Sequence, residues 1–239
     1  MDCLNLGRGG ATAALATLAV SSLGWTGSAA YATSGILHTT NVVLLEEAPA
    51  SVRADRRVSN TDAHLFTERE SFTLTNDLPV GLTRGGVFEP GVDLANGLIP
   101  AGTEITVHFL HWDFPSQPET SRVVDGSVLF GEGRMIAGVI STNEGLDSTD
   151  ALLGAPGVEY PVDDFSRRVE LDPELAGREG QDRVTINPEM SRLEFHLELG
   201  DRWLDQMRII TIERPAVVPT PAGLAAVGAL GLIGLRRRR

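Results

Sequence analysis

Apolar and polar residues alternate along most of the chain between residues 33 and 217. The clearest stretch is 191–199, in which every second residue is apolar: Leu193, Phe195, Leu197 and Leu199. Residues 103–109 alternate in the same way. Because successive side chains of a β-strand point to opposite faces, this period of two predicts strands with one buried face and one solvated face.

Further stretches combine β-branched or aromatic residues with flanking turn residues: 35–45, 63–74, 122–130, 135–141, 167–171, 182–186 and 207–212. Gly, Pro, Asn and Asp separate them, as turns require. About nine short strands without a long amphipathic helix favour an all-β fold, an antiparallel β-sandwich. One short helix is predicted at residues 148–153, with Asp147 as its N-cap, Asp150 in its first turn and Gly154 at its end.

The first 32 residues have the three parts of a secretory signal peptide. Arg8 provides a weakly positive start, and residues 11–23 form an uncharged apolar run. Ala30 and Ala32 then flank Tyr31 in a small-x-small cleavage site. We therefore expect export with cleavage before Thr33; the alternative is a buried N-terminal helix.

The last part of the chain is also an ordered series of signals. Val218, Pro219, Thr220 and Pro221 precede an apolar stretch, 222–235, and the chain then closes on four arginines: Arg236, Arg237, Arg238 and Arg239. A helix over the apolar stretch would be about 21 Å long, so it would cross a hydrocarbon layer of about 30 Å only with local thinning. Since basic residues stay on the cytoplasmic side, the tail predicts an N-outside orientation.

This tail resembles the PEP-CTERM sorting signals that exosortase-type enzymes recognise and cleave. In those signals a Val-Pro-Glu-Pro motif, an apolar helix and a basic cluster follow one another, and Thr220 stands here where they have Glu. The resemblance implies an exosortase-type partner and transient insertion of the tail into the inner membrane; a permanent membrane anchor is the alternative. The chain would then comprise a signal peptide (1–32), a β-sandwich domain (33–217) and a sorting signal (218–239).

Residues 63–212 resemble a β-rich domain that is common in PEP-CTERM-tailed proteins. The matching stretches follow in order: 109–113, 126–130, 136–140, 146–161, 167–171 and 205–211. Arg168 stands where that domain has Gly, and residues 202–204 are additional. This second resemblance implies an address in the cell envelope or outside the cell, and no chemistry.

The charge of the chain excludes one class of partner. The formal net charge is −12, from 32 acidic and 20 basic residues, and every basic residue is an arginine. Because the two end segments hold five of the arginines and only one acidic residue, Asp2, the body is more acidic still. Such a surface repels phosphate, which argues against nucleic-acid binding. Cys3 is the only cysteine, so the body has no thiol nucleophile, thiolate ligand or disulfide.

Motifs that carry chemistry are absent from the sequence: there is no P-loop, G-x-S-x-G, H-E-x-x-H or dinucleotide fingerprint. His108, His111 and Asp113 form an H-x-x-H-x-D string, a spacing that suggests a metal site. Strand alternation places His108 on the face opposite to the other two. We therefore interpret the string as polar residues at the end of a strand, and we expect no catalytic residue and no cofactor.

Two weaker patterns suggest ligands. Asp147 and Asp150 offer carboxylate oxygens of the kind that Ca²⁺ prefers, although their place at a helix start explains them without an ion. Trp112, Tyr160 and Trp203 would form a sugar-stacking platform if they were exposed on one face, and core packing is the alternative.

Taken together, these patterns predict a non-catalytic structural protein of the cell envelope or extracellular matrix. It would pass through the export machinery, be sorted by its tail and be retained with extracellular polysaccharide. One alternative is a carbohydrate- or calcium-binding module, which requires an exposed aromatic patch or clustered carboxylates. The other is a secreted hydrolase, which requires a cleft with converging titratable groups.

Overall fold

The computed structural model describes residues 35–113, 122–131, 133–162, 167–171, 181–199 and 204–215. These ranges cover most of the predicted β-sandwich domain, 33–217. The predicted signal peptide and sorting signal, with their cleavage and motif residues, lie outside them.

Twelve strands form two larger sheets and one small ribbon in this part of the chain. The first sheet is antiparallel throughout, in the order β1 (Ile36–Thr40), β8 (Arg122–Phe130), β11 (Arg192–Leu199), β10 (Arg183–Ile186) and β5 (Gly86–Phe88). The second sheet has the order β2 (Val42–Leu44), β3 (Ala63–Thr73), β7 (Glu104–Trp112), β12 (Asp205–Glu213) and β9 (Arg134–Ile140). Its pairs are antiparallel except β2 with β3. The ribbon pairs β4 (Leu78–Val80) with β6 (Gly97–Ile99).

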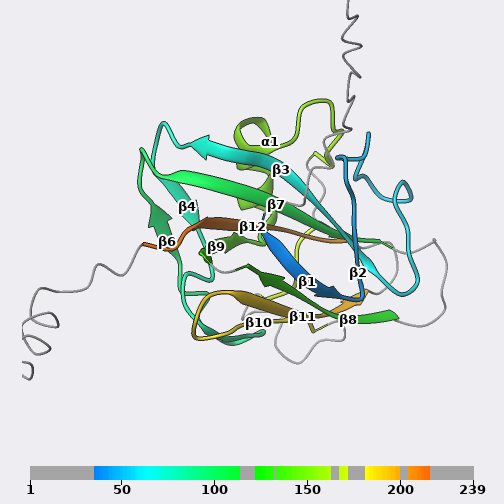
Figure 1. The fold of residues 1–239 in the computed structure, drawn as a ribbon. Helices are drawn as coiled ribbons and strands as arrows, with labels where there is room; N and C mark the ends of the chain where they lie inside the picture. The colour runs from blue at the N-terminus through cyan, green and yellow to red at the C-terminus, as the bar shows by residue number, and fades with distance from the viewer. Residues whose placement is uncertain are drawn as a thin grey trace, which may run out of the picture. The chain divides into compact units, whose positions relative to one another are not determined.

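The main core lies between the two sheets (Figure 1). The first sheet contributes the inward residues of β8 and β11, and the alternation predicted for β11 is confirmed, because these residues are buried: Leu193, Phe195, Leu197 and Leu199. The second sheet contributes Leu110, Trp112, Met207 and Ile209. The predicted all-β sandwich is therefore confirmed.

A second core lies on the opposite face of the second sheet. There α1 (Asn143–Leu153) packs Leu146 and Leu153 against Phe66, Phe109 and Ile210. Consequently β7 and β12 are covered on both faces, and almost every residue of these two strands is buried. Polar side chains on the outer face of this sheet are therefore enclosed instead of reaching water.

The helix begins earlier than predicted. Its N-cap is Thr142, whose hydroxyl accepts a hydrogen bond of 3.1 Å from the Gly145 N–H. Asp147 therefore lies inside the helix, and its predicted capping role is wrong. The earlier start places both Leu146 and Leu153 on the face that packs against the sheet. The predicted end at Gly154 is confirmed.

Two strand predictions differ from the structure, and three short strands had not been predicted. The stretch 35–45 is broken into β1 and β2 at Asn41, which has a φ of 50°. The stretch 167–171 is no strand and makes only an isolated bridge from Arg168 to Gln206. The strands β4, β5 and β6 were not expected, since three residues are too few to show alternation.

Gly126 leaves room for a core aromatic ring, which yields a first test. Gly126 of β8 lies opposite Phe195 of β11, and a Cβ atom added to it would lie 2.2 Å from the Cζ atom of that ring. We expect Gly126→Ala to lower the free energy of unfolding by about 1–3 kcal/mol, because overpacking a closed core forces strain. Urea denaturation measures this. Gly131→Ala is the control, since its new Cβ would meet nothing nearer than 3.5 Å; equal effects of the two substitutions would contradict the packing argument.

Candidate functional site

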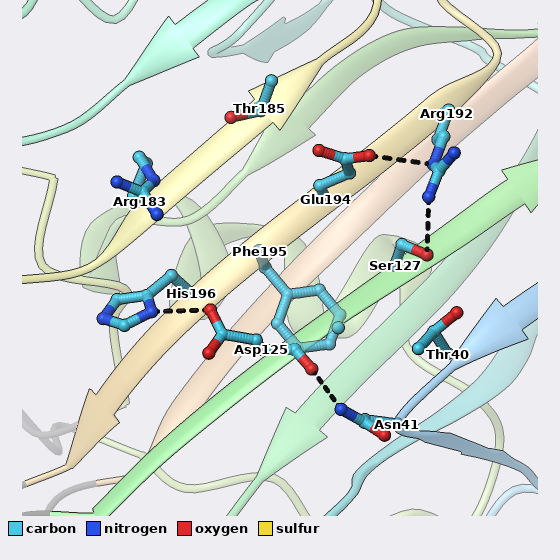
Figure 2. Close-up of a pocket in the computed structure, with 11 residues that line it drawn as sticks. Thr40, Asn41, Asp125, Ser127, Arg183, Thr185, Arg192, Glu194, Phe195 and His196 are labelled. Carbon is cyan, nitrogen blue, oxygen red and sulfur yellow. Dashed lines mark hydrogen bonds and ion pairs between the residues drawn. The ribbon is translucent and has the colours of Figure 1, made fainter.

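A polar hollow of about 310 Å³ lies on the solvent face of the first sheet, and we refer to it as the outer groove (Figure 2). Its lining residues come from β8, β10 and β11 and from the end of β1: Thr40, Asn41, Asp125, Gly126, Ser127, Arg183, Thr185, Arg192, Glu194, Phe195 and His196. The charged members are exposed residues of β8, β10 and β11, and along each strand they alternate with residues that are buried in the main core. The groove is therefore a direct result of strand alternation.

Two polar contacts between side chains organise the outer groove. His196 Nδ1 lies 2.7 Å from Asp125 Oδ1 across the β8–β11 pair, and Arg192 Nε lies 3.1 Å from Glu194 Oε1. Pairs as exposed as these contribute little to stability, so folding alone does not require them. Phe195 turns its ring beneath Gly126 into the core and offers no stacking surface. The groove thus offers charged and hydrogen-bonding side chains to solvent and no aromatic surface.

Beneath α1, Arg208 of β12 is fully buried, and all five of its N–H groups donate hydrogen bonds. Nε and Nη2 donate to the Glu68 carboxylate at 2.7 and 3.0 Å. Nη2 also donates to Asp150 Oδ1 at 2.6 Å, and Nη1 donates to Leu146 O and Thr149 Oγ1. Arg208 therefore joins the sheet to the helix.

The charges in this network are balanced inside the protein. Burial alone would lower the pKa of Arg208, but the Glu68 and Asp150 carboxylates raise it above its ordinary value. Burial raises the pKa of Glu68, whereas Arg208 and the Tyr160 hydroxyl act in the opposite direction. Arg208 and Tyr160 both donate hydrogen bonds to the oxygens of Glu68. Because each oxygen only accepts, this arrangement fits the ionised carboxylate.

Arg167 makes a second link between helix and sheet. It is fully buried, and its guanidinium donates to Asp147 Oδ1 at 2.6 Å and to Asp150 Oδ2 at 2.7 Å. Its Nε donates to Gln206 Oε1 at 2.9 Å. The two aspartates that the sequence offered as calcium ligands are thus neutralised by arginines, and their oxygens hold the helix in place instead.

The histidine string does not converge on one point. His108 lies on the inner face of β7, where Nδ1 is 3.2 Å from Thr67 Oγ1 and the ring packs against Phe130. His111 lies on the outer face; its Nδ1 accepts from Gln206 Nε2 at 3.0 Å and its Nε2 donates to Arg57 O at 3.1 Å. Burial is the main cause that lowers the pKa of each ring to about 3. Both therefore stay neutral, and the interpretation against a shared metal site fits this geometry.

The aromatic residues proposed for sugar stacking do not share an exposed face. Trp112 is fully buried between the sheets, and its Nε1 donates to Ser59 O. Tyr160 packs edge-on against Phe109, with ring centroids 5.4 Å apart, and its hydroxyl donates to Glu68. Trp203 lies outside the described residues. Trp112 cannot stack on a sugar in this fold, because its ring has no contact with solvent.

A cluster that the sequence did not indicate lies at one end of the main core. Single carboxylate oxygens of Glu170, Asp182 and Asp205 lie within 4.8 Å of one another. Burial, followed by the neighbouring carboxylates, raises the pKa of Asp205 well above its ordinary value. These residues are far apart along the chain, and the one local signal is that Asp205 falls in the alternation of Met207 and Ile209. We refer to them as the acidic cluster.

No protein-family model matches the chain, and comparisons with curated proteins and with solved structures find no match. Within the described ranges, no helix has both the length and the apolar character needed to cross a membrane.

Proposed function

We propose that the chain is an exported, non-catalytic protein of the bacterial cell envelope or extracellular matrix, sorted through its PEP-CTERM-like tail. The observation that carries the proposal is the ordered sequence of the tail: Pro219, Thr220 and Pro221, then the apolar run 222–235, then four terminal arginines. A signal-peptide-like segment at the other end gives an export-then-sort layout.

The use that the body makes of its charged residues supports a structural role. Arg208, Glu68 and Arg167 are fully or almost fully buried. Their hydrogen bonds join them to one another or to residues of α1 and of the second sheet. All five N–H groups of Arg208 are used within the protein in this way, so none of them is available to a substrate. The outer groove is the surface at which the exported domain would contact an extracellular polysaccharide.

Replacing the four terminal arginines tests the sorting proposal. In a variant with Arg236, Arg237, Arg238 and Arg239 changed to Gln, we expect export to continue and the product to be misrouted, because the cationic stop that fixes the orientation of the tail is lost. Cell fractionation with immunoblotting follows both the location and the size of the product.

A matched control removes the same charge from the body. Arg53, Arg56, Arg84 and Arg122 are exposed on the folded domain and lie outside the outer groove, and their replacement with Gln should leave sorting unchanged. If the tail variant keeps the size and the fractionation of the wild type, the proposed sorting role of the arginines is wrong.

A further inference from the structure

The acidic cluster is formed by three separate segments that meet beside the main core. Glu170 belongs to the segment 167–171, Asp182 directly precedes β10, and Asp205 is the first residue of β12. Asp205 pairs with Trp112 of β7, and strand alternation places it on the face of Met207 and Ile209, which lie between the sheets. The cluster is therefore part of the folded interior and not of the acidic surface.

Asp205 distinguishes this cluster from an ordinary group of acidic residues. It is 0% exposed, and neither Oδ1 nor Oδ2 has a hydrogen-bond partner among the described residues. An isolated buried carboxylate is strongly disfavoured unless a counter-charge or hydrogen bonds compensate it. Its neighbours in the cluster are themselves carboxylates, and their negative charge makes an ionised Asp205 still less favourable. A cation bound between the carboxylates would compensate the charge of Asp205 and occupy both of its free oxygens.

Asp182 is held in an orientation that suits the same partner. Its Oδ2 accepts from the Glu170 N–H at 2.6 Å and its Oδ1 accepts from the Glu198 N–H at 2.8 Å. A carboxylate offers about four acceptor positions, and these two bonds use two of them. The side chain of Glu170 forms a further hydrogen bond with Asp182. Asp182 is fully buried, whereas Glu170 is only half-buried and provides a side from which an ion can enter. The positive charge of Arg168 acts to lower the pKa of Glu170, and it offsets part of the negative charge of the cluster.

The ligand chemistry identifies the class of ion. The three groups are all carboxylates, without a nitrogen or sulfur ligand, and such sets suit hard cations. Two oxygens on opposite sides of Ca²⁺ lie about 4.6–5.2 Å apart, because each bond measures about 2.3–2.6 Å. The three oxygens of the cluster all lie within 4.8 Å of one another, so none is farther from another than two ligands of one Ca²⁺ can be. Three carboxylates supply about three to six ligands of the six to eight that Ca²⁺ takes.

We propose that Glu170, Asp182 and Asp205 form a calcium site that joins the start of β12 to the start of β10 and to the segment 167–171. The inference does not depend on export or sorting, because it concerns only the folded body. Calcium bound there would link the start of β10 in the first sheet to the start of β12 in the second.

The test compares thermal unfolding of the full-length chain, purified in detergent and stripped of metal, with and without about 10 mM CaCl₂. For a dissociation constant in the range of extracellular calcium modules, about 0.1–1 mM, we expect the wild-type Tm to rise by roughly 3–10 °C. Terbium, a luminescent substitute for calcium, should bind the wild type and show emission sensitised by Trp112, which pairs with Asp205.

Two variants and a control locate the effect. Asp205→Asn should abolish the calcium-dependent rise in Tm and weaken terbium binding at least about tenfold, since it removes the central charge. Glu170→Gln should act in the same direction and serves if Asp205→Asn does not fold. Asp125→Asn removes an exposed carboxylate of the outer groove and should keep the full response. A wild type that shows neither a calcium-dependent Tm nor terbium binding, or a response equal in all variants, would overturn the proposal.

Discussion

Glu68→Gln is expected to lower the free energy of unfolding by about 3–5 kcal/mol, the usual effect of breaking a buried ion pair from one side. Glu68 and Arg208 both have side chains that are 0% exposed. A glutamine amide would turn its N–H₂ group toward the donors of Arg208 or of Tyr160, and only one of the two acceptor oxygens would remain. Arg208 would then stay buried with Asp150 as its one remaining carboxylate partner in this network.

Thermal and chemical denaturation measure this effect, with Glu159→Gln as the control. Glu159 accepts a hydrogen bond of 2.8 Å from Arg53, but more than half of each side chain is exposed. The chemical change is the same and the burial differs, so the control should leave Tm nearly unchanged. For Glu68→Gln we expect a fall in Tm of roughly 6–20 °C. A small effect at both positions would show that the network does not hold the helix on the sheet.

His108→Asn is expected to make the protein less sensitive to acid. Burial, aided by the positive charge of Arg134, lowers the pKa of His108 to about 3 in the folded state. The unfolded chain takes up a proton below about pH 6.5, whereas the folded protein resists it down to about pH 3. The contribution of the neutral ring to stability is therefore complete above about pH 6.5, and it decreases by about 1.4 kcal/mol for each pH unit below that.

The measurement is the slope of the unfolding free energy against pH between about pH 6 and pH 4. We expect the slope of His108→Asn to be smaller than that of the wild type by about 1.4 kcal/mol per pH unit. Only the difference is predicted, because the buried carboxylates shift in the opposite direction. Thr67→Val is the control: it removes the hydroxyl beside His108 Nδ1 and keeps the imidazole, so its slope should match the wild type. Equal slopes for all three proteins would contradict the buried neutral ring.

The fold class could be predicted because the alternation in β11 and β8 reflects one buried and one solvated face. The bounds of β8 match the predicted stretch 122–130. The stretch 167–171 alternates as well, but β12 already pairs with β7 along one edge and with β9 from Arg208 onward along the other. Only the start of β12 is free along that edge, and there Arg168 forms an isolated β-bridge with Gln206. Competition for an edge depends on tertiary packing, which a local pattern does not contain.

The buried charges could not be predicted for a related reason. Arg208 within the apolar run of β12 has the spacing of a solvent-facing residue. It is enclosed because α1 covers the outer face of the second sheet. The acidic cluster joins residues 12 to 35 positions apart in the chain, Glu170, Asp182 and Asp205, and only the assembled sandwich brings them together.

The intact mass of the protein recovered from the envelope and from the medium tests the proposed function most directly. We expect a product that starts near Thr33 and ends near Pro219, because the proposed export and sorting would remove both end signals. A product that keeps its arginine tail and remains in the membrane fraction would contradict sorting through the tail and would indicate a permanently anchored domain.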